Sequence, residues 1–347
     1  MMTNLLRLGV FFVLILPAAV MAIEITGAGS MIPVHLMKAW GDAYSQRTPG
    51  TTIKYQGSTP AEGIKRLINK EVDFASIDMP LSLEELKKNG LMQFPFVLGA
   101  IAPMVNLHNI YIGQLKLDAK VLGDIFLGNV KKWNDPAIVA MNPKVQLPDA
   151  EIIIVHRFAS PGVKTMIGDL LAKNNAHWKE IKGSSMGGSW PATAIEVKNP
   201  KEHFEKIKQN PNSIGYGSIP LAMRLGLPYV KMRNIEGNFV SPSDENVSAA
   251  ASNAKWDESN GFDVVLTDQP GANTWPMSNT SFILLRKTSE HPEHTRALLK
   301  FFKYGLRYGG LKAVESDYIP LPDTVAKLVQ KSWNNIVDEK GVPVLKD

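Results

Sequence analysis

Two charged residues stand just beyond apolar strands, where they could meet a small anion. Arg157 follows the apolar run Ile152–Val155 and precedes a glycine-containing turn. A guanidinium there can present a planar fork of donors to an oxyanion, although a lone arginine is more often a surface or salt-bridged side chain. Asp78 follows a strand predicted over 72–77. An aspartate there is ordinarily a turn or helix cap; beside an anion it is costly unless it accepts a proton from the ligand. If the ligand is a protonated oxyanion such as hydrogen phosphate, an aspartate in the site would be explained.

Three strand-to-loop-to-helix turns are the elements that must position these charges. They are predicted at 23–33, 53–66 and 152–162. In the second, Ser58 or Thr59 can cap the helix, and Pro60 suits the first helical position. A helix N-terminus offers free N–H groups and a positive dipole end, so three such ends at one point would make an anion site. The ordinary alternative is that each turn is a common joint of an α/β domain.

The composition excludes several other classes of site. The 347 residues include no cysteine, which rules out disulfides, thiolate metal ligands and a thiol nucleophile. The 38 basic and 33 acidic residues are spread along the chain, so nucleic acid is not an expected partner. The sequence contains no P-loop and no H-E-x-x-H motif, Pro33 replaces the third glycine of a dinucleotide fingerprint, and the histidines of the 291–294 segment fit a solvated helix end better than a metal site. We expect neither an enzyme nor a cofactor.

The first 22 residues have the pattern of a signal peptide. Arg7 precedes an apolar stretch over 8–16, which is too short to span a bilayer comfortably, and Val20-Met21-Ala22 offers small residues for cleavage. We expect cleavage after Ala22 and export of the mature protein. An uncleaved membrane anchor is the alternative.

Two apolar runs divide the rest of the chain. The runs at 94–106 and 278–285 predict buried strands that cross between two lobes. Lobe 1 would then comprise residues 23–100 and 277–347, and lobe 2 residues 101–276. Helices are predicted over 33–48, 292–308 and 323–333, a capping box begins at Ser82, and the tryptophans are expected to be packing anchors. The polar stretch 234–256 is expected to be an excursion on the surface.

Many short motifs, in order over nearly the whole mature chain, carry a family resemblance. They are Thr26-Gly27-Ala28-Gly29, Tyr55-Gln56-Gly57, Val72-Asp73-Phe74, Asp78-Met79-Pro80-Leu81-Ser82, Gln93-Phe94-Pro95, the segment 122–128, Lys131-Lys132-Trp133-Asn134-Asp135, Ile214-Gly215-Tyr216, Trp275-Pro276, Ser281-Phe282-Ile283-Leu284 and Leu321-Pro322-Asp323. At these residues the chain resembles the periplasmic phosphate-binding proteins of phosphate-specific (Pst) ABC importers. The resemblance implies a type II periplasmic binding protein fold: two α/β lobes, joined by crossing strands, that close over a dehydrated phosphate without catalysis. It also implies a monomer that delivers its ligand to a membrane permease.

The resemblance carries over to only part of the ligand shell. Arg157, Asp78 and Gly162 match the family pattern. The family's Thr and aromatic residue after the first strand are here Met31 and Ile32, and Pro60 takes the place of the first serine in the second turn. In the third turn, the usual Asp, Ser and Thr are replaced by Ala159, Pro161 and Val163. The ligand contacts predicted on this basis are Ser30, Met31, Ile32, Ser58, Thr59, Asp78, Arg157, Ser160 and Gly162.

Two alternatives remain beside inorganic phosphate. The substitutions Met31, Pro60, Pro161 and Val163 make the cleft more apolar, which would suit a phosphonate, a phosphoester or another anion. The chain could also be a secreted interaction protein that has lost transport.

Overall fold

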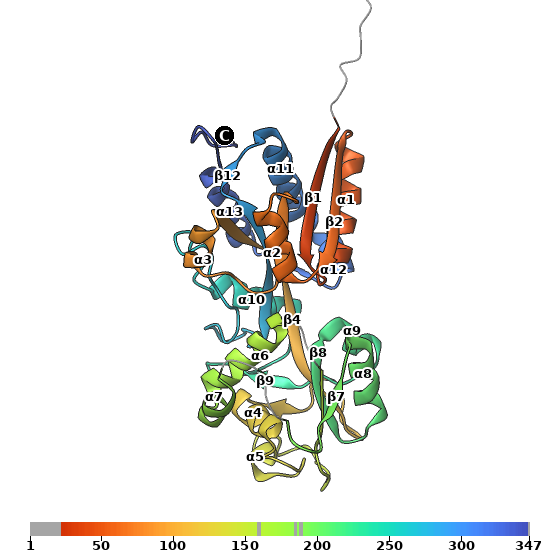
Figure 1. Ribbon diagram of the computed structural model, residues 1–347. Helices are drawn as coiled ribbons and strands as arrows, with labels where there is room; N and C mark the ends of the chain where they lie inside the picture. Colours follow the sequence, from red (N-terminus) through yellow and green to blue (C-terminus); the bar gives the residue numbers. More distant parts are fainter. Residues whose placement is uncertain (1–21, 158–160, 184–185, 187–189, 346–347) are drawn as a thin grey trace, which may run out of the picture.

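Two α/β lobes, stacked one above the other, are joined by a long strand (Figure 1). The computed structural model describes residues 22–157, 161–183, 186 and 190–345. Strand β4 (Leu91–Asn106) belongs to both lobes: residues 91–100 pair with β11 (Ser278–Arg286), and residues 101–106 pair with β8 (Ser213–Ser218). The predicted two-lobed α/β fold and its crossing strand are thereby confirmed. The exact lobe boundaries stay a prediction, and residues 1–21 of the expected signal peptide lie outside the described part.

Lobe 1 is built on parallel strands that run down towards lobe 2. Strand β1 (Ile23–Ser30) lies between β2 (Thr51–Ser58) and β3 (Phe74–Ile77). Strand β11 follows β3 and is antiparallel both to it and to the next strand, β4. The other elements of this lobe are α1 (Val34–Arg47), α2 (Pro60–Ile68), α3 (Leu83–Lys88), β12 (Thr288–Ser289), α11 (Pro292–Tyr308), α12 (Gly310–Glu315), β13 (Ile319–Pro320), α13 (Asp323–Ser332), the 3-10 turn Trp333–Asn335 and β14 (Val337–Asp338). The predicted helices agree closely with α1, α11 and α13.

Aromatic side chains fill the core of lobe 1. The ring centroids of Trp40 in α1 and Phe96 lie 6.1 Å apart in an edge-to-face contact. Those of Phe302 in α11 and Phe74 lie 5.2 Å apart, also edge to face. The Trp40 indole nitrogen donates to the Gly309 carbonyl at 3.0 Å, so its polar atom is satisfied inside the core. Five of the tryptophans are fully buried, as expected of packing anchors: Trp40, Trp133, Trp178, Trp275 and Trp333. The predicted capping box of α3 is also present: the Glu85 N–H donates to Ser82 Oγ at 3.3 Å, and the Ser82 N–H donates to Glu85 Oε2 at 3.1 Å.

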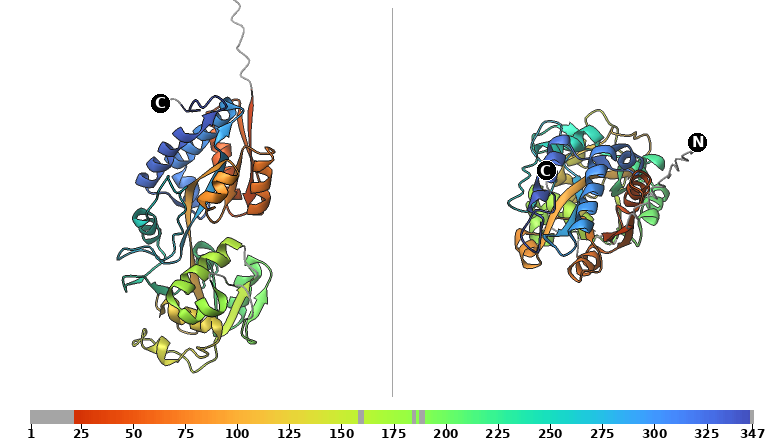
Figure 2. Two further views of the ribbon diagram at one scale, coloured as in Figure 1. Left: turned by 60° about the vertical axis from the view of Figure 1, so that its left-hand side comes forward. Right: turned by 90° about the horizontal axis from the view of Figure 1, so that it is seen from above.

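Lobe 2 continues the same sheet beyond β4. Its strand order is β8, β6 (Ile153–Arg157) and β7 (Ile195–Val197), all parallel to one another. A smaller sheet joins β5 (Lys116–Leu117), β9 (Lys231–Arg233) and β10 (Phe239–Val240). The helices are α4 (Ala119–Leu127), α5 (Pro136–Val139), α6 (Pro161–Asn174), α7 (Ala176–Lys182), α8 (Pro200–Gln209) and α9 (Ile219–Arg224). A side view shows the lobes stacked with β4 between them (Figure 2).

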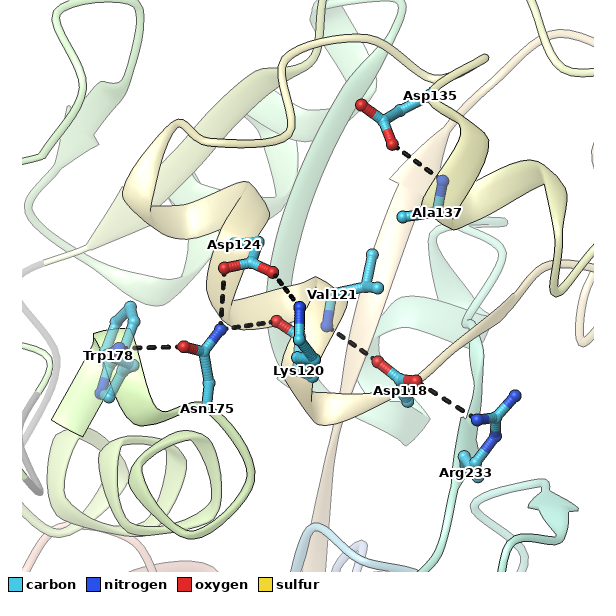
Figure 3. Close-up of polar contacts among 9 residues, drawn as sticks. All are labelled: Asp118, Lys120, Val121, Asp124, Asp135, Ala137, Asn175, Trp178 and Arg233. Carbon is cyan, nitrogen blue, oxygen red and sulfur yellow. Dashed lines mark hydrogen bonds and ion pairs between the residues drawn. The ribbon is translucent and has the colours of Figure 1, made fainter.

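One asparagine ties the helices of lobe 2 together (Figure 3). The Asn175 amide donates to the Lys120 carbonyl at 2.8 Å and to Asp124 at 2.9 Å, while its oxygen accepts the Trp178 N–H at 3.0 Å. Asn175 thus caps α7 and anchors it on α4. A similar cap starts α4, where Asp118 accepts the Val121 N–H at 2.8 Å and lies 3.5 Å from Arg233. These contacts join α4 to α7 and to β9.

The expectation of a surface excursion over 234–256 is wrong. The stretch contains β10 and α10 (Asp244–Asn253), and α10 buries Val247, Ala250 and Ala251 against β4, β11 and β13. Figure 1 shows α10 beside β4, at the level where the lobes meet. The apolar stripe of α10 is short and mostly alanine, so the polar residues around it hid the periodicity. Within the described residues, no helix is both long and apolar enough to cross a membrane.

Candidate functional site

The carboxyl ends of the lobe 1 strands meet at the edge that faces lobe 2. Ser30 lies opposite Ser58 in the β1–β2 register, and Gly29 lies opposite Ser76 of β3. Gly29 has a φ of +127°, and a Cβ there would sit 2.3 Å from the Ser76 carbonyl oxygen. Gly63 of α2 approaches in turn, since its Cβ would lie 2.5 Å from the Gly29 Cα. Glycines therefore bring the first two predicted turns together.

Asp78 is the buried charge of this edge. Its side chain is 7% exposed and is hydrogen-bonded to Ser30, while its Oδ1 atom has no partner in the described structure. Burial raises the pKa of the Asp78 carboxyl, and the Ser30 hydrogen bond only partly opposes this. A buried carboxyl oxygen that lacks a donor is ready to accept a proton from a ligand.

Two tyrosines order the atoms around Asp78. The Tyr55 hydroxyl donates to the Ser30 carbonyl at 2.7 Å, so Ser76 must donate to Tyr55 across their 2.5 Å contact. The Ile32 N–H donates to Ser30 Oγ at 3.0 Å, which leaves the Ser30 hydroxyl proton for Asp78. The hydrogen-bond directions around the carboxyl are thereby determined.

Tyr318 reaches the same loop from the other end of the chain. Its hydroxyl donates to the Ile32 carbonyl at 2.6 Å. Burial raises the pKa of both tyrosines, with the negative Asp78 nearby adding to the effect. We did not predict either tyrosine as a site residue. Tyr55 stands in a family motif and within the second predicted turn, whereas Tyr318 gave no signal, because its partner is a backbone carbonyl.

The other predicted residues of lobe 1 surround this cluster with mixed roles. Met31 is 64% exposed, and its sulfur lies close to Gly57. A Cβ atom added to Gly57 would lie 2.5 Å from the Met31 sulfur. Thr59 caps α2 by accepting the Glu62 N–H at 3.2 Å, as expected, and Ser58 donates to the Thr59 carbonyl at 3.2 Å. That these residues contact a ligand stays a prediction.

Lobe 2 contributes Arg157 at the end of β6. The side chain is partly buried, and burial lowers the pKa of its guanidinium, which is nevertheless protonated at any physiological pH. The Tyr216 hydroxyl donates to the Arg157 carbonyl at 3.4 Å. Helix α6 begins at Pro161, so Gly162 lies in its first turn, while Ser160 lies outside the described residues.

Neutral rings surround the base of Arg157. His156 stacks on Trp190 with ring centroids 4.1 Å apart, and burial lowers the pKa of the imidazole. Burial, together with the Arg157 charge, lowers the pKa of His203 to about 3. Both histidines are uncharged at neutral pH, so neither adds positive charge beside the guanidinium.

Asp78 opens on a small cavity where the two lobes meet. The cavity is lined by Asp78, Met79 and Pro80, by Met166 of α6, by residues 264–266 and by β11. No ion pair joins Asp78 to Arg157 among the described residues, and burial dominates the pKa shift of each. The two charged residues therefore come from different lobes and make no direct ion pair in this arrangement. No group of three or more potential metal ligands gathers in the described part of the chain.

The comparisons with known proteins agree with this geometry. The PBP superfamily domain model matches residues 17–306. The phosphate-binding protein PstS of Pasteurella multocida is 39% identical over 315 residues, 90% of each chain, and PstS of Haemophilus influenzae is 39% identical over 310 residues, 89% of this chain and 92% of its own.

The chain belongs to the PstS phosphate-binding protein family, within the PBP superfamily. Solved structures extend the likeness of fold for this PstS family member. An ABC-type phosphate transport receptor from Vibrio cholerae gives a TM-score of 0.58 at 20% identity, covering 86% of this chain and all of its own. A phosphate-binding protein from Stenotrophomonas maltophilia gives 0.59 at 15% identity, covering 89% and 94%.

Proposed function

We propose that this protein captures inorganic phosphate between its lobes and delivers it to the membrane permease of an ABC importer in the periplasm. The observation that carries the proposal is the unpartnered Oδ1 of Asp78, buried where the lobes meet. An anion that still holds a proton can donate to this oxygen. Sulfate carries no proton at neutral pH and would be repelled. Kinship with PstS proteins supports phosphate as the ligand.

Lobe closure would complete the site. Rotation of lobe 2 about β4 would bring Arg157 towards an anion held by Asp78 and exclude water from the contact. A hydrogen bond to a charged group contributes about 1.5–3 kcal/mol, so the arginine and the carboxyl together would provide much of the affinity. We place the remaining donors at Ser30, Ser58, Thr59, Ser160 and the backbone near Ile32 and Gly162, with Met31 at the rim.

A second ligand class fits one specific observation. Met31 and Ile32 are 64% and 36% exposed at the mouth of the lobe 1 half-site, where the family has a Thr and an aromatic residue. These apolar side chains would suit the organic group of a phosphonate or phosphoester. A thermal-shift screen against such anions separates the two ligand classes, because a response to phosphate alone would reject the second.

Further expectations belong to the same proposal. We infer an exported monomer with a cleaved signal peptide, no nucleic-acid partner and no catalytic turnover. Phosphatase activity abolished by an Asp78 substitution would overturn the last point. A cleft that responds to no small anion, together with a stable protein partner, would instead indicate a secreted interaction protein.

Calorimetry with ligand-stripped, refolded protein tests the function. We expect phosphate to bind with micromolar or tighter affinity and sulfate to give no heat. Arg157→Gln should weaken phosphate binding by about ten- to a hundred-fold, the equivalent of one charge-assisted contact. Lys179→Gln, an exposed charge change on α7, is the matched control. Phosphate affinity no better than millimolar in the unaltered protein would reject the proposal.

A further inference from the structure

A two-pronged ion pair bridges the lobes beside the crossing strand. Arg224, the last residue of α9 in lobe 2, donates through Nη1 and Nη2 to the two carboxylate oxygens of Asp317 in lobe 1, at 2.9 and 2.7 Å. Helix α9 follows β8, whose Ser218 pairs with Ile101 of β4. Asp317 precedes β13, whose Ile319 pairs with Leu98 of the same strand. The ion pair thus spans the point where β4 passes from one lobe to the other.

Asp317 holds its place at a conformational cost. Its φ is +68°, in the left-handed region that favours glycine. The Asp317 N–H donates to the Val314 carbonyl at 3.0 Å and the Tyr318 N–H to the Ala313 carbonyl at 2.8 Å, the hydrogen bonds of a Schellman end to α12. Glycine is the residue that such a helix end prefers. An aspartate here therefore points to a role for its carboxylate.

The next residue connects this pair to the candidate site. Tyr318 donates to the Ile32 carbonyl at 2.6 Å, in the loop whose Ile32 N–H orders Ser30 beside Asp78. One dipeptide, Asp317-Tyr318, therefore touches both lobe 2 and the ligand loop of lobe 1. A movement of α9 relative to lobe 1 would be transmitted through Asp317 and Tyr318 to the Ile32 carbonyl.

We propose that the Arg224–Asp317 pair is a latch that opposes closure of the lobes over an anion and is coupled through Tyr318 to the anion-binding loop. The Arg224–Asp317 pair is formed in this structure, in which no ion pair joins Asp78 to Arg157 among the described residues. Closure must rotate lobe 2 about β4, and the two parallel hydrogen bonds of a guanidinium–carboxylate pair tolerate little rotation. Breaking the latch would favour closure and raise the apparent affinity, because more of the free protein would already be competent to bind. The affinity part of this inference rests on the proposed function.

The cysteine-free chain suits a direct test of lobe separation. Spin labels on Lys65→Cys in α2 and Lys179→Cys in α7, both exposed, report the interlobe distance by pulsed electron resonance without ligand. Asp317→Gly retains the helix end and removes the carboxylate, and Arg224→Gln removes the other partner. We expect each to increase the short-distance population about two- to five-fold, as suits one exposed ion pair.

Controls and a second readout make the outcome decisive. The double variant should shift the population no further than either single one, and Lys312→Gln, which removes a 2.6 Å ion pair within α12, should leave it unchanged. High salt should shift the parent protein and not Asp317→Gly. Unchanged or longer distances in both single variants would overturn the latch. Because these distances are measured without ligand, failure of phosphate binding would not be mistaken for failure of the latch. If phosphate is the ligand, loss of the latch should tighten phosphate binding two- to five-fold.

Discussion

At the scale of single residues, Asp78 combines burial with incomplete hydrogen bonding. Its carboxyl has one protein donor, Ser30, and one orphaned oxygen. A folded-state pKa above the ordinary value of 3.8 means that the folded chain binds the proton more tightly than the unfolded chain. The charged form therefore destabilises the ligand-free fold at neutral pH, and this penalty fades as the pH falls towards 3.8. A ligand that donates a proton to Asp78 would relieve this destabilisation, and the relief would contribute to the free energy of binding.

Asp78→Asn should accordingly stabilise the ligand-free protein at pH 7. We expect a gain of about 1–2 kcal/mol in the free energy of unfolding, because the amide needs no buried charge. The gain should shrink as the pH approaches 4. Urea unfolding at several pH values measures this, with Asp42→Asn on the exposed face of α1 as control. A loss of stability at pH 7 would contradict the assigned environment of Asp78.

His203 provides a pH effect of the opposite sign. It is fully buried, and its pKa falls from 6.5 to about 3, so the folded state keeps the ring neutral. Its contribution to stability is present above pH 6.5 and is lost as the pH falls from there towards 3. The variant His203→Gln retains an acceptor for the Tyr216 N–H. Between pH 7 and pH 5 we expect its free energy of unfolding to fall by about 1–2 kcal/mol less than that of the parent protein. Thermal unfolding at both pH values tests this, with the exposed His177→Gln as control; equal losses in the variant and the parent would contradict it.

The sequence identified Asp78 and Arg157 because each has a charge at a recognisable strand end. The sequence did not identify Tyr55 and Tyr318 as site residues, for a physical reason. Their hydroxyls donate to backbone carbonyls, which any residue type can offer, so no pair of side chains marked the contact. The direction of the proton on Ser30 likewise follows only from the folded geometry.

At the scale of elements, glycines decide how closely the turns approach. Alanine normally stabilises a helix relative to glycine by about 1 kcal/mol. At Gly63 the added Cβ would lie 2.5 Å from the Gly29 Cα, so we expect Gly63→Ala to destabilise the protein by about 1–3 kcal/mol and to weaken anion binding. Lys65→Ala, exposed in the same helix, should be neutral or stabilising. Chemical denaturation tests this, and a stabilised Gly63→Ala protein would show that α2 does not need this close contact.

The elements that the sequence predicted correctly have strong signals. Long apolar runs predicted β4 and β11, and caps and helical periodicity predicted α1, α3 and α11. Helix α10 was missed because Val247, Ala250 and Ala251 form a small apolar stripe within a polar stretch. This stripe packs against β4, β11 and β13, which are distant from it in the sequence.

At the scale of the whole molecule, the two charged residues of the candidate site lie in different lobes. Lobe 1 holds the Asp78 carboxyl, lobe 2 holds the Arg157 guanidinium, and β4 joins them as one continuous strand. The fold class followed from the crossing strands and from family motifs, whereas the ion pair beside the crossing emerged only in three dimensions.

The most direct test of the central claim is a crystal structure of the protein grown with phosphate. We predict one phosphate between the lobes, with Asp78 Oδ1 and the Arg157 guanidinium both within about 2.6–2.9 Å of its oxygens. Phosphate bound to one lobe alone, or bound away from Asp78, would contradict the account.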